Sequence, residues 1–157
     1  MRVIQSAPVD PEPHYAQMIK ADKIKTIEVY EKDEKRENSV WKAEDARIER
    51  KGNEVHVYGI AMRSKFVLDA KAKRQDVIEV NQGDKVFVHL TNIDLDEDIT
   101  HGFGINNLNL NYEIQPGETR TLEFTADKAG TFPIYCTNFC SALHQEMTGY
   151  LLVKPKN

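Results

Sequence analysis

The chain has 157 residues, a length typical of one domain, and 40% of its residues are hydrophobic. Its 25 acidic residues outnumber its 21 Lys and Arg residues, which gives a net charge of −4. That balance argues against nucleic acid and anionic membranes as partners. No apolar run approaches the ~18 residues of a membrane-spanning helix, and the N-terminus lacks the apolar core of a secretion signal. We therefore expect no membrane span.

Residues 1–50 are interpreted as an N-terminal arm or linker. They hold ten Lys or Arg and eleven Asp or Glu, and their prolines at the start disfavour a regular helix. We expect the strands of the main domain to begin only near Asn53, so residues 1–45 should be dispensable for metal binding.

From Asn53 onward, residues 51–157 read as one all-β domain. Hydrophobic and polar residues alternate, and Gly, Pro, Asn and Asp separate the runs. Seven or eight short strands at this spacing favour an antiparallel sandwich or Greek-key barrel. The predicted strands are Glu54–Met62, Val77–Val80, Lys85–Thr91, Gly102–Ile105, Tyr112–Ile114, Thr119–Thr125, Gly130–Tyr135 and Gly149–Val153.

Four candidate metal ligands lie between the last two predicted strands. Cys136, Cys140, His144 and Met147 follow one another as C-x3-C-x3-H-x2-M. Thiolate, imidazole and thioether are ligands that soft transition metals prefer, and loops on a sandwich can hold them rigidly. His101, at the start of an earlier strand, is the expected further donor.

The ligand set leaves the metal open among alternatives. A mononuclear electron-transfer copper needs only one Cys, so the second would be surplus. Zinc could take both Cys and both His residues but would leave Met147 without a role. A binuclear copper centre uses every donor, with both thiolates shared by the two metals. We favour binuclear copper over zinc, and place a disulfide below both.

The same residues resemble a known family. C-x3-C-x3-H-x2-M, with a strand-start His 35 residues before the first Cys, resembles the CuA site of cupredoxin domains in nitrous oxide reductase and cytochrome c oxidase subunit II. The local sequence around His101, Cys140 and His144 resembles that of the reductase more than that of the oxidase subunit. The resemblance implies a cupredoxin-like Greek-key sandwich with two copper ions. It implies that the thiolates of Cys136 and Cys140 bridge the two metals and that His101 and His144 are terminal ligands. It also implies that Met147 is a weak axial ligand and that the backbone carbonyl of Asn138 is the remaining donor.

Asn138 and Ser141 depart from the family, because many nitrous oxide reductases have Trp and His at these positions. Position 138 donates through its backbone, so the metal should be spared. Earlier in the chain, the surroundings of His14 resemble the end of the reductase's catalytic propeller, where a late His binds the catalytic copper-sulfide centre. A solvated arm residue is the equally weighted alternative for His14.

The function implied by the resemblance is electron transfer. A c-type cytochrome or small blue-copper protein would donate electrons, and the catalytic copper domain of the reductase would receive them to reduce N2O to N2, with a homodimer as one arrangement. This chain alone should not turn over N2O. A periplasmic location is also implied by the resemblance. The alternatives are a copper chaperone or thiol-disulfide protein, and a structural zinc-binding sandwich domain.

Two further groups of polar residues are interpreted as surface features. His56 and His89 alternate with core valines, so we expect exposed strand histidines. The acidic run from Asp94 to Asp98 is expected to be a solvated turn that could attract a basic redox partner.

Overall fold

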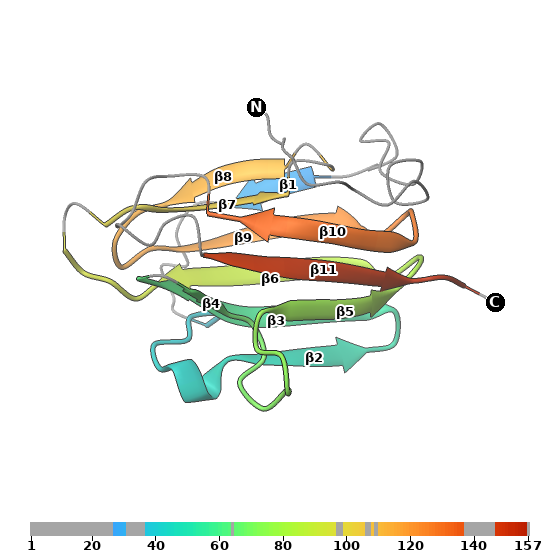
Figure 1. Cartoon of the computed structure of the whole chain (residues 1–157), viewed down its shortest axis with the longest axis horizontal. Coiled ribbons are helices and arrows are strands. Elements are labelled where there is room, and N and C mark those ends of the chain that lie inside the picture. The colour runs from blue at the N-terminus through green and yellow to red at the C-terminus, as the bar shows by residue number, and fades with distance from the viewer. Residues whose placement is uncertain are drawn as a thin grey trace.

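Eleven strands form two facing sheets in the part of the chain that the structure describes (Figure 1). The structure is a computed structural model, and it describes residues 27–30 (backbone only), 37–63, 65–96, 99–105, 108, 110–136 and 147–156. No helix within these ranges is long and apolar enough to cross a membrane. The strands are β1 (Ile27–Tyr30), β2 (Arg47–Lys51), β3 (Glu54–Met62), β4 (Lys65–Val67), β5 (Val77–Asn81), β6 (Lys85–Asn92), β7 (His101–Ile105), β8 (Leu110–Ile114), β9 (Thr119–Thr125), β10 (Gly130–Tyr135) and β11 (Thr148–Lys154).

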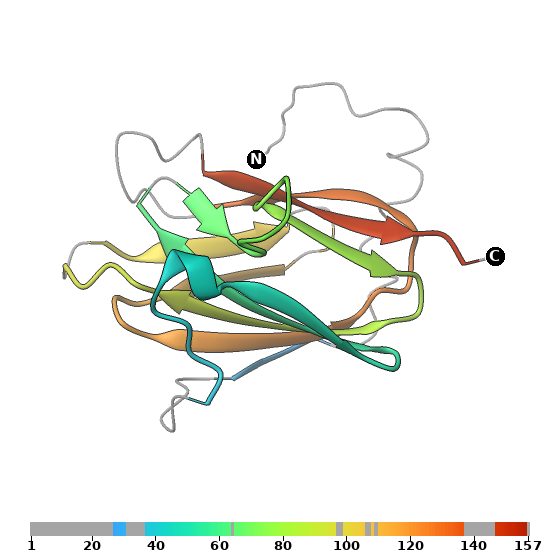
Figure 2. The same cartoon turned by 90° about the horizontal axis from the view of Figure 1, so that it is seen from below.

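The two sheets lie as layers, seen from the side in Figure 2. Sheet A has the order β1-β9-β6-β3-β2, with β4 paired to β3, and sheet B has the order β5-β11-β10-β7-β8. The predicted all-β sandwich is confirmed, but it is not purely antiparallel, because β3 pairs with β6 and β5 pairs with β11 in parallel. After β3 and β4 the chain adds β5 to sheet B before it returns as β6, so these neighbours are not joined by hairpins.

The core between the sheets follows from the alternation in the sequence. On β3, Val55 and Val57 are buried, whereas His56 and Tyr58 lie on the outer face of sheet A. Sheet B supplies inward residues such as Phe132 and Leu151 from β10 and β11. Each such side chain contributes about 1.5–3 kcal/mol on full burial, so a one-residue register shift would be strongly unfavourable.

The predicted strands are present, but pairing begins earlier in the chain than expected. The expectation that strands begin only near Asn53 is wrong, because β1 pairs with β9 and β2 pairs with β3. The β2 sequence RIERK is mostly polar, as suits an edge strand with little buried surface, and therefore lacks the alternation that predicts a strand. Apart from these two strands, the division into an arm (1–50) and a domain (51–157) stays a prediction.

Candidate metal centre

Three of the predicted ligands meet at one end of sheet B. Cys136 directly follows β10, and Met147 directly precedes β11, so the antiparallel pairing of these strands brings the two residues together. The Cys136 N–H donates to the Met147 carbonyl at 3.1 Å. β10 also pairs with β7, whose first residue is His101. All three side chains are buried, with exposed fractions of 5%, 1% and 0% for Cys136, Met147 and His101.

The His101 ring is held in one orientation by a carboxylate. Nε2 lies 2.7 Å from Oδ2 of Asp94 and donates its proton to that oxygen. Nδ1 is buried and has no hydrogen-bond partner among the described residues. Burial lowers the pKa of His101, but the neighbouring Cys136 and Asp94 side chains outweigh burial and raise it. A nitrogen buried without a partner, beside a thiol, is the arrangement expected of an imidazole that binds a soft metal through Nδ1.

Asn92 holds the turn that carries Asp94. The Asn92 side chain is fully buried at the end of β6, and its amide donates to the carbonyls of Ile99 at 2.8 Å and Ile114 at 2.9 Å. Its Oδ1 accepts from the N–H of Asp94 at 3.0 Å. The hydrogen bonds to Ile99 and Asp94 therefore fix the turn before β7, and with it the carboxylate that orients His101, while the third ties Asn92 to the end of β8.

Sequence reasoning missed Asn92 and Asp94 as positioning residues. Asp94 was assigned to a solvated turn, but it contacts the buried His101. Asp96 lies 4.0 Å from Arg63, whereas Glu97 and Asp98 lie outside the described residues. An acidic residue in a loop shortly before a candidate His ligand was the available signal, since metal-binding histidines commonly donate their other ring N–H to a carboxylate.

The other predicted ligands lie outside the described residues. Asn138, Cys140 and His144 belong to the loop between β10 and β11, and His14 belongs to the N-terminal segment. Within the described ranges no group of three or more His, Cys, Asp or Glu residues could hold a metal ion. The described donors are the imidazole, one thiol and one thioether, which are ligand types suited to copper. The roles of the remaining three residues stay predictions.

The expectation that His56 and His89 are exposed is wrong, because His89 is only 4% exposed and the His56 side chain is only 19% exposed. The two rings hydrogen-bond to each other, with 3.0 Å between Nδ1 of His56 and Nε2 of His89. His89 Nδ1 also lies 2.8 Å from Oγ1 of Thr121, and the His56 ring stacks on Phe87 with centroids 4.4 Å apart. The alternation placed both residues on the correct face of sheet A, but it could not show that neighbouring rings would cover that face.

Comparison with known proteins agrees with this geometry. Residues 61–153 match the family model of the cupredoxin-like domain. The nitrous-oxide reductase of Stutzerimonas stutzeri is 34% identical over 164 residues, which cover 99% of this chain and 25% of that protein. Subunit 2 of cytochrome c oxidase from Thermus thermophilus is 36% identical over 77 residues, which cover 49% of this chain and 54% of that protein. The chain thus spans about a quarter of the length of the nitrous-oxide reductase that it matches.

Solved structures share the fold. A chain of a heme-copper terminal oxidase dimer superposes with a TM-score of 0.60 at 23% identity, covering 74% of this chain and 77% of that chain. The periplasmic domain of cytochrome oxidase subunit II from Bradyrhizobium japonicum superposes with a TM-score of 0.50 at 14% identity, covering 70% of this chain and 89% of that chain. With the family model matched over most of the sandwich, and with this fold, the chain belongs to the cupredoxin family.

Proposed function

We propose that this chain is a binuclear copper electron-transfer domain of a nitrous-oxide reductase. The observation that carries the proposal is the buried His101 ring, whose Nε2 is held by Asp94 and whose side chain interacts with that of Cys136. Met147 is joined to Cys136 through the backbone. The homology to nitrous-oxide reductase, an oxidoreductase, supports this context.

The proposed ligands divide into three roles. Cys136 and Cys140 would bridge both metal ions, because one thiolate can bind two metals and the chain offers two. His101 and His144 would each complete one metal ion. Met147 would be a weak ligand, and so would the carbonyl of Asn138. When bound, the copper pair would supply one-electron chemistry, accepting and releasing single electrons between a soluble donor and a separate catalytic centre.

The protein's contribution to this chemistry is rigidity and exclusion of water. His101 is held by Asp94, and Asp94 is held by Asn92, so the imidazole is oriented before metal binds. Cys136 and Met147 are fixed by the pairing of two strands. Ligands that move little between oxidation states lower the reorganisation energy of electron transfer. Burial of all three described donors keeps water from competing for the metal.

The wider context of the proposal follows the relatives. The donor would be a c-type cytochrome or a small blue-copper protein, and the acceptor would be the catalytic copper domain of the reductase, in the periplasm. The described residues offer no second cluster of candidate metal ligands for N2O reduction. We therefore expect this chain alone to exchange electrons without turning over N2O.

Metal content and two methionine variants test the proposal. The full chain loaded with copper should bind two copper ions and show intense thiolate-to-copper absorption. Met147→Leu should keep the colour and shift the reduction potential, because Met147 would be a weak thioether ligand that tunes the metal without holding it. Met62→Leu is the matched control, since Met62 lies on β3 outside the ligand cluster and should leave the potential unchanged.

Two outcomes would contradict the proposal. One zinc ion per chain without colour would indicate a structural Cys2His2 site. An unchanged binuclear spectrum in Cys140→Ser would show that this thiol does not bridge.

A further inference from the structure

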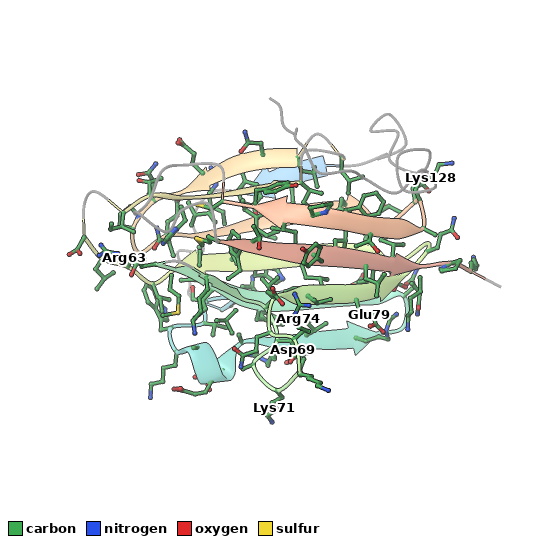
Figure 3. The ribbon with its side chains drawn as sticks, in the orientation of Figure 1. Arg63, Asp69, Lys71, Arg74, Glu79 and Lys128 are labelled. Atoms are coloured by element: carbon green, nitrogen blue, oxygen red, sulfur yellow. The ribbon has the colours of Figure 1, made fainter. Side chains whose placement is uncertain are left out.

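A basic hollow opens beside the candidate metal centre. It has a volume of about 360 Å³ and lies between the connection from β4 to β5 and the start of β11. Lys65, Lys73 and Arg74 line it, together with Thr148, which directly follows Met147. In Figure 3 this connection projects from the sandwich and carries Asp69, Lys71 and Arg74. The hollow therefore lies next to Met147, the proposed ligand that directly precedes β11.

The connection is tied tightly to β11. The Asp76 carbonyl accepts from the N–H of Tyr150 at 2.9 Å. A Cβ on Gly149 would lie 2.5 Å from the same carbonyl oxygen, so only glycine permits this approach. The basic side chains are thus carried on backbone that is fixed to the strand leaving the metal cluster, and a partner bound there would have a defined position relative to the centre.

The hollow carries positive charge on a negatively charged protein. Its one lining carboxylate, Asp76, is paired with Arg74 through two contacts of 3.0 Å. Lys65, Lys73 and the nearby Lys71 are exposed and have no ion-pair partner among the described residues. Asp69, in the same connection, accepts from the Lys71 backbone N–H at 3.3 Å and does not line the hollow. Glu44 and Asp45, on the 3-10 helix Ala43–Asp45, do not line it either. The chain as a whole has a net charge of −4, so this positive potential is local.

In the acidic turn before β7, one of the two described carboxylates is already hydrogen-bonded. Asp94 is hydrogen-bonded to His101, and Asp96 lies 4.0 Å from Arg63. The Asp94 carboxylate is therefore already bound within the fold, whereas Lys65 and Lys73 at the hollow and the nearby Lys71 have no ion-pair partner among the described residues. Charge complementarity at the hollow itself favours an acidic partner.

We infer that the basic hollow docks an acidic soluble electron carrier, whose surface carboxylates face Lys65, Lys71 and Lys73. This inference rests on the proposed electron-transfer function and names the charge of its partner. The reduced carrier would lose one electron and the oxidised metal centre would gain it, and no bond would form or break. Exposed Tyr150, with Arg74 5.7 Å above its ring, adds the aromatic and guanidinium contacts that protein interfaces favour.

The test uses a small blue-copper plastocyanin of strongly negative net charge as the probe. Amide NMR shifts of the full metal-free chain should change on titration around residues 65–76 and at Thr148. The affinity should fall steeply when ionic strength rises from about 0.01 M to 0.1 M, as the Debye length shortens from about 30 to 10 Å. The triple variant Lys65→Glu, Lys71→Glu, Lys73→Glu should bind about tenfold more weakly.

A matched triple variant controls for net charge. Lys51→Glu, Lys128→Glu and Lys156→Glu make the same total change, and Figure 3 places Lys128 at the opposite end of the molecule from Arg63. This control should alter the affinity less than about twofold. Equal weakening by both triples, or shift changes centred on residues 94–96, would overturn the inference. Tighter binding of a basic cytochrome c than of the plastocyanin would also overturn it.

Electron paramagnetic resonance separates this inference from the proposed function. After copper loading, the Lys65/Lys71/Lys73 variant should keep the spectrum of the unmodified chain, because none of the three lysines is a proposed ligand. If copper bound normally and docking failed, only the docking inference would fall. If the chain bound no copper pair while the metal-free NMR result held, the proposed function would fail and the surface would remain an acidic-protein site.

Discussion

At the scale of single residues, orientation of His101 matters as much as its identity. An imidazole has two nitrogens, and the hydrogen bond from Nε2 to Asp94 leaves Nδ1 as the nitrogen available to a metal ion, in a ring that lies beside Cys136. The sequence motif predicts that His101 is a ligand but does not predict which of its ring nitrogens would bind the metal. That choice depends on a carboxylate seven positions earlier, brought into contact only when β6 and β7 occupy different sheets.

Replacement of Asp94 should weaken metal binding. Asp94→Ala removes the acceptor for His101 Nε2, so the ring loses its fixed orientation. Loss of such a partner typically costs about 10- to 100-fold in metal affinity. Competition of the copper-loaded protein with a chelator measures the change. Asp96→Ala is the control, because the Asp96 side chain is 83% exposed, and equal weakening by both variants would contradict the positioning role of Asp94.

Asp84 should make stability depend on pH on the acid side. Burial raises the pKa of Asp84, but the Arg50 guanidinium at 2.6 and 3.1 Å and the Asn81 N–H at 2.7 Å outweigh burial and lower it. Because the folded-state pKa is the lower one, the stabilisation is complete above the ordinary Asp value of about 3.9 and is lost as pH falls through the folded value.

Denaturant unfolding between neutral and acid pH measures this effect. Asp84→Asn should cost about 1–3 kcal/mol near neutral pH and should flatten the acid decline. The control Glu79→Gln alters an exposed carboxylate paired with exposed Lys154, so its acid decline should match that of the unmodified chain. An acid decline unchanged by Asp84→Asn would exclude this pair as its source.

At the scale of elements, strand pairing builds the metal cluster from distant parts of the chain. β7, β10 and β11 are neighbours in sheet B, and the cluster lies where β7 and β11 begin and β10 ends. The sequence predicted β10 and β11 well because residues such as Phe132 and Leu151 alternate with more exposed ones, whereas β7 is buried throughout. It could not predict the parallel pairings, since strand order between sheets depends on long-range packing rather than on local periodicity.

Short and edge strands escaped prediction for a physical reason. β4 has only three residues, and β2 buries little of its surface, so neither carries enough alternation to be distinguished from a loop. The ligand motif was local and therefore readable. Asn92 and Asp94 act through contacts across the fold, and such contacts leave little trace in a single sequence.

Gly149 should be essential to the start of β11. Gly149→Ala places a methyl group against the Asp76 carbonyl, so β11 must shift relative to β5 near Met147. Overpacking of this kind costs about 1–3 kcal/mol. Chemical denaturation should show the loss, and the amide NMR shift of Met147 should change. An unchanged unfolding midpoint would mean that the backbone there relaxes freely.

At the scale of the whole molecule, the sandwich extends into the segment first interpreted as an arm. β1 pairs along β9, Val40 is only 4% exposed, and the Ser39 hydroxyl lies 2.9 Å from that of Thr119. Residues before position 51 therefore add strands to sheet A, and Val40 packs against it. The expectation that residues 1–45 are dispensable is accordingly replaced by an expectation of lost stability.

Two truncations test this expectation. Removal of residues 1–45 should lower the Tm by at least about 5 °C, because it removes the β1 pairing and exposes the surface that Val40 covers. Removal of residues 1–26 leaves every described strand in place and should have a smaller effect. Equal Tm values for the two truncated chains would show that the early strand and Val40 contribute nothing to stability.

The measurement that tests the central claim most directly is the electron paramagnetic resonance spectrum of the copper-loaded full chain. The account predicts one unpaired electron shared by two equivalent copper nuclei, because both thiols would contact both metals, and a hyperfine pattern from two equivalent nuclei would report that sharing. A hyperfine pattern from a single copper nucleus would contradict the binuclear centre and the bridging roles of Cys136 and Cys140.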